Sequence, residues 1–406
     1  MAKAPPMPLE EAQKHLLALA SPLPTEHVDI EGAIGRYLAQ PLLARRTQPA
    51  ADLSAMDGYA VTGDDMAGPW HVVGESAAGH PFMGEVGSGE AVQVSTGAVL
   101  PAGAGAVILQ EDLARQDHSI ALTGDAPVPS HKHIRRCGLD FIEGSEVIAA
   151  GSLIGPADAA LAISAGHKHL PVCRKPRVAV IDSGDELSAD PEACAPHQIP
   201  ASNGAMLLAM ARKLPVEAWR SGPVADTLDA LIGAFNAAHR ADVIVTSGGA
   251  SVGEHDLVRP ALEAWGASLD FWRVAIKPGK PILVARRERP TGPQIVIGLP
   301  GNPVSSFVTA YHFMLPLLRR MLGARYALPM QIVTKLGAPI RANGPRREFI
   351  RGTWNGQSVT PQAIQDSGAL SALAASNVLI DREAFAPEGA PGDEIRVFLL
   401  QNGGIA

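Results

Sequence analysis

The middle of the chain alternates between two hydrophobic patterns. Short, β-branched apolar runs favour strands, and longer segments with apolar residues every three or four positions favour helices. The expected strands are 178–181, 216–219, 243–246, 272–276, 282–285 and 295–297. The expected helices are 204–214, 227–239, 257–265 and a long one over 302–318. Strands that alternate with helices predict βαβ units and a mostly parallel sheet.

Other patterns flank this region. Residues 9–19 have the spacing of an amphipathic helix, and a second short helix is expected over 30–38. Between Ser54 and Phe141, glycine-rich turns separate short β-type runs, which indicates a mostly β module. Its expected strands are 59–61, 70–73, 91–94, 106–109 and 119–122. A helix predicted over 156–165 follows, so the β module is inserted into a helical region.

We therefore predict a multidomain α/β fold. Its centre is a three-layer α/β/α domain with a mostly parallel sheet over residues 176–326. A helical N-terminal region (1–46 and 144–175) holds the inserted β module (47–143), and a small β-barrel-like domain (327–406) ends the chain.

Composition narrows the class of protein. The 406 residues are 46% hydrophobic, which is ample for real cores. The net charge is −7 without a basic stripe, so nucleic acid is not an expected partner. The three cysteines lack metal-site spacing and suit a reducing compartment. No apolar run reaches the ~18 residues of a spanning helix, and the first residues lack a signal-peptide pattern, so we expect no membrane association and a cytoplasmic location.

Polar, glycine-rich loops follow five of the expected strands. They are 182–186, 222–226, 247–256, 277–281 and 299–303. The carboxyl ends of parallel strands meet at one edge of a sheet, where loop amides and helix N-termini can face an anion. Glycines let the backbone approach such a ligand, lysines add charge, and carboxylates can hold a hard cation. The combination suits a phosphorylated ligand with magnesium.

Each of these loops has an ordinary alternative interpretation. Turns are rich in Gly, Pro, Asp and Asn by default, and each carboxylate could cap a helix or lie solvated at the surface. This alternative is strongest for Asp226, because a helix is expected to begin at Thr227. The case for a site therefore rests on the five loops together.

Two sequence signatures suggest other functions. Residues 249–253 match G-x-S-x-G, which would make Ser251 a hydrolase nucleophile. However, Ser247, Gly248 and Gly249 separate Ser251 from the strand, whereas a nucleophile serine sits directly at a strand-to-helix corner, and no HGGG-type oxyanion loop is present in the sequence. A phosphate-binding P-loop fails because Lys280 is followed by Pro281. His131 with His133, like His167 with His169, lacks further metal ligands nearby in the sequence.

The motifs as a set resemble the MoeA family of molybdopterin molybdenumtransferases, which includes the E domain of gephyrin. They lie at 54–61, 95–101, 183–187, 246–256, 276–281 and 299–306, so the resemblance covers almost the whole chain. It implies a Mg²⁺-dependent transferase that inserts molybdenum from molybdate into adenylylated molybdopterin and releases AMP and molybdenum cofactor. It also implies an elongated homodimer of four-domain chains that dimerises through its helical region, with the site in a cleft that both subunits share.

The resemblance assigns roles to individual residues. It implies catalytic roles for Asp57, Glu186, Asp226, Asp256, Lys277 and Lys280. The four carboxylates of that set are also the implied metal ligands. The implied pterin and phosphate contacts are Thr96, Gly97, Ser183, Gly184, Asp185, Ser247, Gly248, Gly249, Ser251, Pro300, Gly301, Asn302 and Ser305. Asp140 matches a further acidic position, and Arg135 or Arg136 a basic one.

The match is incomplete at a few positions. Ser183 replaces the family's usual threonine, Leu139 replaces an acidic residue, and the tail loop 367–373 matches only loosely. Two other functions stay open: a molybdopterin adenylyltransferase, which would resemble the central domain alone, and a paralogue that binds the pterin without turnover. The retained carboxylates favour an active enzyme, with the adenylyltransferase and recipient molybdoenzymes as candidate partners.

Overall fold

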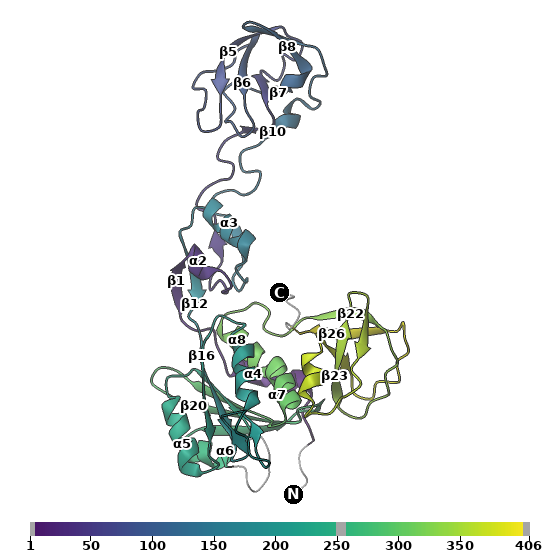
Figure 1. The fold of residues 1–406 in the computed structure, drawn as a ribbon. Coiled ribbons are helices and arrows are strands. Elements are labelled where there is room, and N and C mark those ends of the chain that lie inside the picture. The colour runs from purple at the N-terminus through teal and green to yellow at the C-terminus, as the bar shows by residue number, and fades with distance from the viewer. Residues whose placement is uncertain (1–4, 249–256, 401–406) are drawn as a thin grey trace.

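The computed structural model describes residues 5–248 and 257–400. The chain is elongated, with a β module at one end and an α/β domain beside a β-barrel at the other (Figure 1). The helical region lies between these two ends. Within the described residues, no helix is long and apolar enough to cross a membrane.

A six-stranded sheet of order β16-β13-β17-β21-β20-β18 forms the centre of the α/β domain. Its strands are β13 (Arg177–Ser183), β16 (Glu217–Val224), β17 (Val243–Ser247), β18 (Ser268–Arg273), β20 (Pro281–Arg287) and β21 (Gln294–Leu299). The first four strands of that order are parallel to one another, and β20 is antiparallel to both of its neighbours. Consequently β18 runs in the same direction as β21, and the carboxyl ends of these five strands share one edge.

Side chains that alternate along β13 divide the core into two layers. Val178 and Val180 pack with α4 (Ser202–Ala211) and the long C-terminal helix, whereas Ala179 and Ile181 pack with α5 (Leu228–Ala237) and α6 (Val258–Ala264). This alternation follows from the two-residue period of a strand that is covered on both faces. The predicted three-layer α/β/α domain is therefore confirmed.

The long helix predicted over 302–318 forms, with one irregular turn. It consists of α7 (Pro303–Thr309), the π-helical η3 (Ala310–Met314) and α8 (Leu315–Met321). The N-terminal helix α1 (Leu9–Ala18) packs against it, with Leu9 and Leu16 in the α/β core and the Gln13 amide donating to the His312 carbonyl at 2.9 Å. Although the sequence grouped residues 9–19 with the helical region, α1 packs in the α/β body, because its apolar stripe is buried there.

The helical region holds a small core of its own. Its elements are β1 (Thr25–Asp29) paired with β12 (His169–Cys173), β2 (Leu42–Leu43) paired with β11 (Glu146–Ile148), and the helices α2 (Ile30–Ala33) and α3 (Pro156–Ser164). The helix expected over 30–38 is only one turn long, so that prediction was wrong in extent. Asp29 caps α2, Gly35 adopts φ +77°, and Leu38 bridges to Val172, which extends the backbone instead of continuing the helix.

The inserted β module is a six-stranded sheet of order β7-β4-β6-β5-β9-β8. Its strands are β4 (Gly58–Val61), β5 (Trp70–Ser76), β6 (Glu90–Val94), β7 (Ala106–Leu109), β8 (Leu113–Gln116) and β9 (Ser119–Leu122). Two short 3₁₀ turns, η1 (Gln110–Asp112) and η2 (Ser130–His133), and the pair β3 (Leu53–Ser54) and β10 (Ile134–Arg135) complete it. All five predicted runs form strands.

The C-terminal domain is a closed barrel, as predicted. Its strands are β22 (Gln331–Leu336), β23 (Arg347–Trp354), β24 (Ser358–Pro361), β25 (Val378–Arg382) and β26 (Glu394–Leu399), with a short helix α9 (Leu370–Ala374). The order β23-β24-β22-β26-β25 closes because β25 also pairs with β23. A sixth short strand, β19 (Ile276–Lys277), pairs with β23 in parallel. The strand predicted over 272–276 therefore ends at Arg273, and Ile276 belongs to the barrel sheet.

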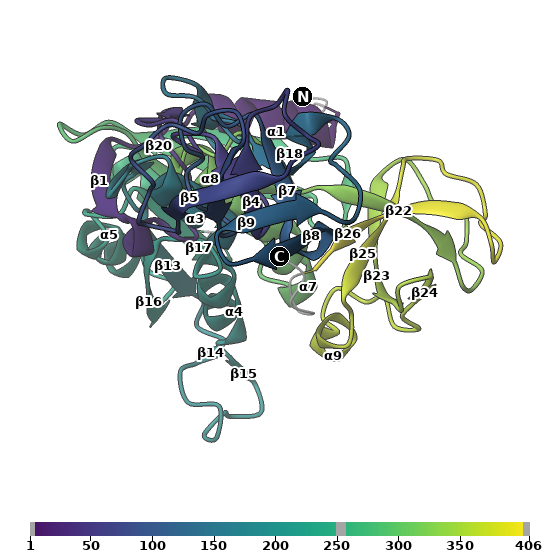
Figure 2. The same cartoon turned by 90° about the horizontal axis from the view of Figure 1, so that it is seen from above.

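One long loop projects from the α/β domain. The short strands β14 (Leu187–Ser188) and β15 (Ile199–Pro200) pair in parallel at its base. Figure 2 shows the loop projecting away from the rest of the molecule. It begins directly after Glu186, whose carbonyl accepts from the Ile199 amide at 2.8 Å.

Candidate active site

Two carboxylates from neighbouring strand ends lie together at the carboxyl edge of the central sheet. The Asp226 amide donates to Oδ1 of Asp185 at 3.1 Å, and the Asp185 amide faces Oδ2 of Asp226 at 3.4 Å. Asp226 does not cap α5, because the Thr227 hydroxyl accepts the Ala230 amide at 3.3 Å. The helix-cap alternative for Asp226 is therefore wrong, and both acidic side chains remain accessible to a ligand.

Glycine fixes the loop that carries Asp185 and Glu186. Gly184 has φ +146° and donates its amide to the Val224 carbonyl at 3.1 Å. A Cβ at this position would lie 2.4 Å from Oε2 of Glu186, so a larger residue would displace that side chain. Glu186 itself is exposed.

The loop after β17 begins with a second constrained glycine. Gly248 has φ +102°, and its amide donates to the Leu299 carbonyl at 3.0 Å while its carbonyl accepts from the Thr246 hydroxyl at 3.2 Å. A Cβ on Gly248 would come within 3.2 Å of the Ser183 carbonyl. The structure therefore brings Ser183, Ser247 and Gly248 together. The predicted residues Gly249, Ser251 and Asp256 lie outside the described residues.

The loop that precedes α7 joins the same edge. The Asn203 side-chain amide donates to the Gly301 carbonyl at 2.7 Å, which links the start of α4 to this loop. Pro300 is buried, whereas Gly301 and Asn302 are exposed. Asn302 occupies the N-cap position of α7, but its side chain makes no capping hydrogen bond. Its side chain is therefore not committed to the helix.

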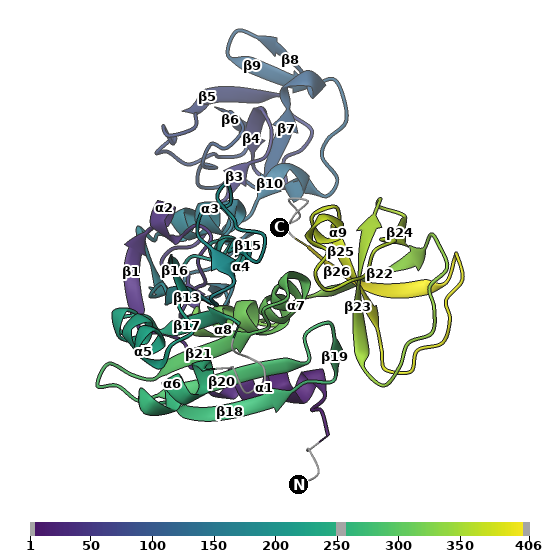
Figure 3. The ribbon, with the colours of Figure 1, turned by 60° about the horizontal axis from the view of Figure 1, so that its bottom comes forward.

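A pocket of about 330 Å³ lies between the α/β domain and the barrel. From the α/β side it is lined by Lys277, Gly279 and Ser305, all in predicted site loops. The barrel contributes Arg346, Glu348, Arg351, Gln365, Asp366 and Ser367. The Val304 amide donates to the Ser367 carbonyl at 3.0 Å, so the barrel loop is docked on the first turn of α7. Figure 3 shows β19 and α7 facing the barrel at this junction.

Basic side chains give this pocket its chemistry. Lys277 Nζ lies 2.7 Å from Oε1 of Glu348. Arg351 is 1% exposed, and its Nη2 donates to the carbonyls of Ile364 and Asp366 at 3.2 and 3.0 Å. Burial lowers the pKa of Arg351, but a guanidinium stays protonated in proteins. Lys280, the other predicted lysine, is half-buried. Lys280 does not line the pocket, but Lys277, Arg346 and Arg351 place three cationic groups around it against the carboxylates of Glu348 and Asp366, and this excess of positive charge suits a small oxyanion.

Sequence reasoning missed the barrel half of this pocket. Arg346 lies directly before β23 and Arg351 within it, so neither belongs to one of the five predicted loops that follow the α/β strands. The sequence signals for this half were the charged run 346–348 and the tail loop 367–373, which matched the family pattern loosely. Their place in the pocket depends on the docking of β23 against β19.

Asp57 and Thr96 form a separate polar pair in the β module. Oδ1 of Asp57 accepts from the Thr96 amide at 2.6 Å and from its hydroxyl at 2.9 Å. These two hydrogen bonds hold the pKa of Asp57 below its ordinary value, so the exposed carboxylate is ionised at neutral pH. Gly97 has φ +85° and donates its amide to the Ser54 carbonyl at 2.9 Å, which fixes the turn that carries Thr96.

A single chain does not bring Asp57 to the acidic pair of the α/β domain, because the helical region separates the two modules (Figure 1). Asp140 lies nearer the helical region, in an open pocket of about 470 Å³. Arg136 pairs with Asp52 at 2.5 Å. The sequence-predicted residues thus fall into two groups that one chain holds apart.

The donor set at the sheet edge fits a magnesium ion that also binds substrate. Among the residues that the structure describes, no three His, Cys, Asp or Glu side chains form a complete metal cage. Magnesium, however, is commonly held by one or two carboxylates together with substrate phosphates. Asp185 and Asp226, with Glu186 adjacent in the same loop, provide such oxygens.

Comparison with known protein families places named domains on most of the chain. Residues 7–166 match the MoeA N-terminal region (domain I and II). Residues 179–320 match the probable molybdopterin binding domain, and residues 333–400 match the MoeA C-terminal region (domain IV). The matches follow the order of the modules in the structure.

Individual relatives match most or nearly all of the chain. A molybdopterin molybdenumtransferase from Haemophilus influenzae is 33% identical over 399 residues, covering 96% of this chain and 97% of the relative. One from a Nostoc species is 33% identical over 338 residues, covering 81% and 77%. A crystal structure of the molybdopterin biosynthesis MoeA protein from Pyrococcus horikoshii superposes with a TM-score of 0.84 at 27% identity, covering 97% of this chain and 100% of that one.

Proposed function

The chain belongs to the MoeA family of molybdopterin molybdenumtransferases, and from this premise we propose that it inserts molybdenum from molybdate into adenylylated molybdopterin, with Mg²⁺, and releases AMP. It is a transferase of molybdenum cofactor biosynthesis. The family match gives no support to a serine hydrolase that uses Ser251, or to a carrier without turnover.

The observation that carries the proposal is the basic pocket between the α/β domain and the barrel. Lys277, Arg346 and Arg351 surround a space of about 330 Å³, which is large enough for a tetrahedral oxyanion with its waters. The hydroxyls of Ser305 and Ser367 add neutral donors. We assign this pocket to molybdate.

The acidic pair at the sheet edge is assigned to the adenylate. Mg²⁺ supplies Lewis-acid stabilisation of phosphate charge when it is bound there. Asp185 and Asp226 would provide the protein oxygens that bind this ion. The turn at Gly248 has no side chain, so its backbone can approach the pterin phosphate. Lys280 belongs to the predicted loop 277–281 and would add positive charge near the phosphates. Hydrolysis of the phosphoanhydride bond consumes one water and gives AMP and the terminal phosphate of the molybdopterin.

A second copy of the chain completes the site. The Asp57–Thr96 pair faces solvent on the β module, and it can meet an α/β domain only if that domain belongs to a partner. The helical region exposes large apolar side chains that an interface would cover, namely Ile34, Leu43, Leu153 and Ile163, which are 49–60% exposed. We therefore expect a homodimer, and light scattering that shows a monomer at working concentration would remove this part of the proposal.

The function is tested by molybdate-dependent AMP release from adenylylated molybdopterin. The wild type should release AMP only when molybdate and Mg²⁺ are both present. Asp57→Asn should lower the rate by about 10² or more, because an ionised group at the site is lost. Asp65→Asn is the matched control: this carboxylate also accepts a backbone amide, that of Gly89 at 2.8 Å, in the same module.

The molybdate pocket is tested in the same assay. Lys277→Met should raise the molybdate concentration needed for half-maximal rate by about tenfold or more, whereas Lys335→Met, which removes an exposed lysine on β22, should not. Absence of AMP release by the wild type would refute the insertase. Pterin binding without release would then support the carrier, and labelling of Ser251 by a fluorophosphonate would support the hydrolase.

A further inference from the structure

A buried ion pair lies directly beneath the acidic edge of the central sheet. Asp182, the penultimate residue of β13, is 0% exposed. Its Oδ2 accepts from Nε of Arg220 on β16 at 2.6 Å, and the Gly204 amide at the start of α4 also donates to the carboxylate. Asp182 immediately precedes the loop that carries Asp185 and Glu186.

The pair also contacts the turn before α4 and lies against the end of β16. Nη2 of Arg220 donates to the Ala201 carbonyl at 2.6 Å, which holds the turn before α4. A Cβ on Gly204 would lie 2.1 Å from Oδ2 of Asp182, and a Cβ on Gly222 would lie 2.4 Å from the Asp182 carbonyl oxygen. Both positions therefore need glycine for the backbone to approach Asp182 this closely.

Through these contacts the ion pair connects four site segments. They are the β13 loop with Asp185, the β16 loop with Asp226, the α4 start, and the α7 loop that Asn203 holds through the Gly301 carbonyl. The bond between the Gly184 amide and the Val224 carbonyl ties the first two loops together above the pair. A shift of Asp182 relative to Arg220 would therefore change the separation of the two acidic residues.

Stability alone does not account for this arrangement. Burial raises the pKa of Asp182 even though Arg220 opposes that shift, and its Oδ1 has no hydrogen-bond partner among the described residues. A buried ion pair of this kind is often no more stabilising than apolar side chains of the same volume. Its charge-assisted hydrogen bonds are directional, however, and directionality fixes geometry.

We propose that Asp182 and Arg220 are positioning residues that set the spacing of Asp185 and Asp226 for a divalent cation and the substrate phosphate. This inference rests on the proposed function for its cation and substrate. The ion pair itself does not touch the substrate, since Asp182 is fully enclosed.

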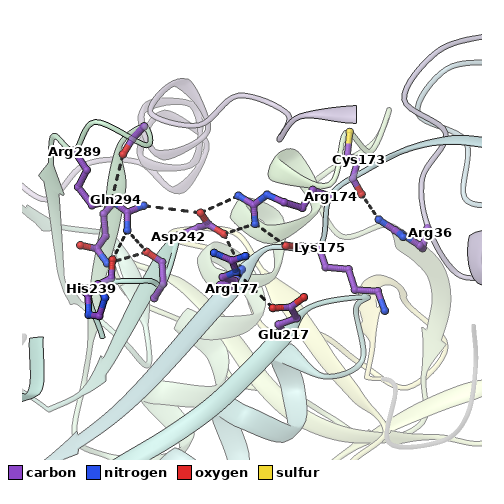
Figure 4. Close-up of polar contacts among 12 residues, drawn as sticks. Arg36, Cys173, Arg174, Lys175, Arg177, Glu217, His239, Asp242, Arg289 and Gln294 are labelled. Carbon is purple, nitrogen blue, oxygen red and sulfur yellow. Dashed lines mark hydrogen bonds and ion pairs between the residues drawn. The ribbon is translucent and has the colours of Figure 1, made fainter. Parts of the chain in front are cut away.

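The control is a second ion pair at the opposite edge of the same sheet. Asp242, which precedes β17, accepts from Nη1 and Nη2 of Arg174 at 2.9 and 3.0 Å and from the Arg177 amide at 2.8 Å (Figure 4). Arg289 Nη2 lies 3.9 Å from Oδ1 of Asp242. This pair is largely buried and also joins strand starts, but none of its contacts reaches a site loop.

The test compares Asp182→Asn with Asp242→Asn. The asparagine at 182 removes the negative charge that pairs with Arg220, with little change in volume, so the ion pair is lost. We expect Asp182→Asn to raise the Mg²⁺ concentration for half-maximal AMP release by about tenfold, while Asp242→Asn leaves it unchanged. An unchanged Mg²⁺ requirement in Asp182→Asn would overturn the inference.

A second measurement does not depend on activity. Hydrogen exchange of peptides covering 183–186 and 222–228 should become at least about tenfold faster in Asp182→Asn and stay at the wild-type rate in Asp242→Asn. If the wild type released no AMP but these loops loosened selectively, the proposed function would fail and the positioning role would stand. Equal exchange in both variants would refute the positioning role.

A milder variant covers the case in which Asp182→Asn does not fold. Arg220→Lys keeps a cation near Asp182 but loses the second hydrogen bond to the Ala201 carbonyl. It should retain the fold and raise the Mg²⁺ requirement by a smaller factor. Wild-type behaviour of Arg220→Lys in both the Mg²⁺ titration and the exchange measurement would count against the proposal.

Discussion

Gly279→Ala adds one methyl group to the floor of the molybdate pocket. Gly279 is buried and has φ +100°, so an L-residue there is strained even before contacts are considered. The added Cβ would lie 2.5 Å from Cγ2 of Thr309, closer than any carbon contact allows. Thr309 cannot easily turn away, because its hydroxyl donates to the carbonyls of Ser305 and Ser306 at 2.7 and 3.1 Å.

These contacts give the expected size of the effect. The backbone strain of a non-glycine residue is roughly 1–2 kcal/mol. Overpacking of a closed core adds about 1–3 kcal/mol. The lower entropy of the unfolded alanine chain offsets about 0.4–1 kcal/mol. We therefore expect Gly279→Ala to lower the free energy of unfolding by about 2–4 kcal/mol.

Gly292→Ala separates the clash from the backbone strain. Gly292 has φ +106°, but a Cβ built there meets nothing within 4 Å. Its loss of stability should be about 1 kcal/mol, from strain alone. Urea unfolding of both variants, followed by circular dichroism, measures the difference. Equal losses would refute the reasoning, because Thr309 would then have moved at no cost. The molybdate requirement should also rise in Gly279→Ala only.

Two further predictions concern titrating groups. Full burial, with Arg347 nearby, lowers the pKa of His312 to about 3 in the folded protein. In the unfolded chain this histidine has its ordinary pKa of about 6.5, so between these two values the unfolded chain binds a proton that the folded protein does not. The free energy of unfolding should therefore fall as the pH drops from about 6.5 to 3, and the unfolding constant should rise by up to about tenfold per pH unit. His312→Phe should flatten that dependence in thermal melts at pH 5 and 7.5, and an unchanged slope would contradict it. Thr96→Val removes one of the two hydrogen bonds that lower the pKa of Asp57, so the acidic limb of the pH–rate profile should move to higher pH. A profile identical to that of the wild type would show that Asp57 ionisation does not limit the rate.

His312 also shows how closely the barrel and the α/β domain are joined. Its ring lies 4.2 Å from that of Phe349 and 4.9 Å from that of Phe398, both in barrel strands. Neither ring nitrogen has a hydrogen-bond partner among the described residues. The two domains therefore share one apolar core, and the molybdate pocket lies along the edge of a packed interface.

Local patterns in the sequence were sufficient for most of the α/β domain. The strand at Val243–Ser247 and the helix at Leu228–Ala237 are each marked by a periodicity that arises within a few residues. The glycine-bounded loops were also predictable, since positive φ at Gly248 and Gly279 depends on the residue itself. The β character of the C-terminal domain and of the inserted module followed from short strands separated by turns, whereas the closure of the barrel comes from the pairing of β25 with β23.

Only the tertiary structure decided which of these loops meet, and what meets them. Arg351 enters the pocket because β23 pairs with β19, and this pairing joins residues such as Ile276 and Arg347, which are 71 positions apart, so no local pattern encodes it. Asp57 is kept from the acidic pair of its own chain by the helical region that separates the two modules. The ion pair of Asp182 and Arg220 was equally invisible, because long-range burial rather than sequence spacing brings its two charges together.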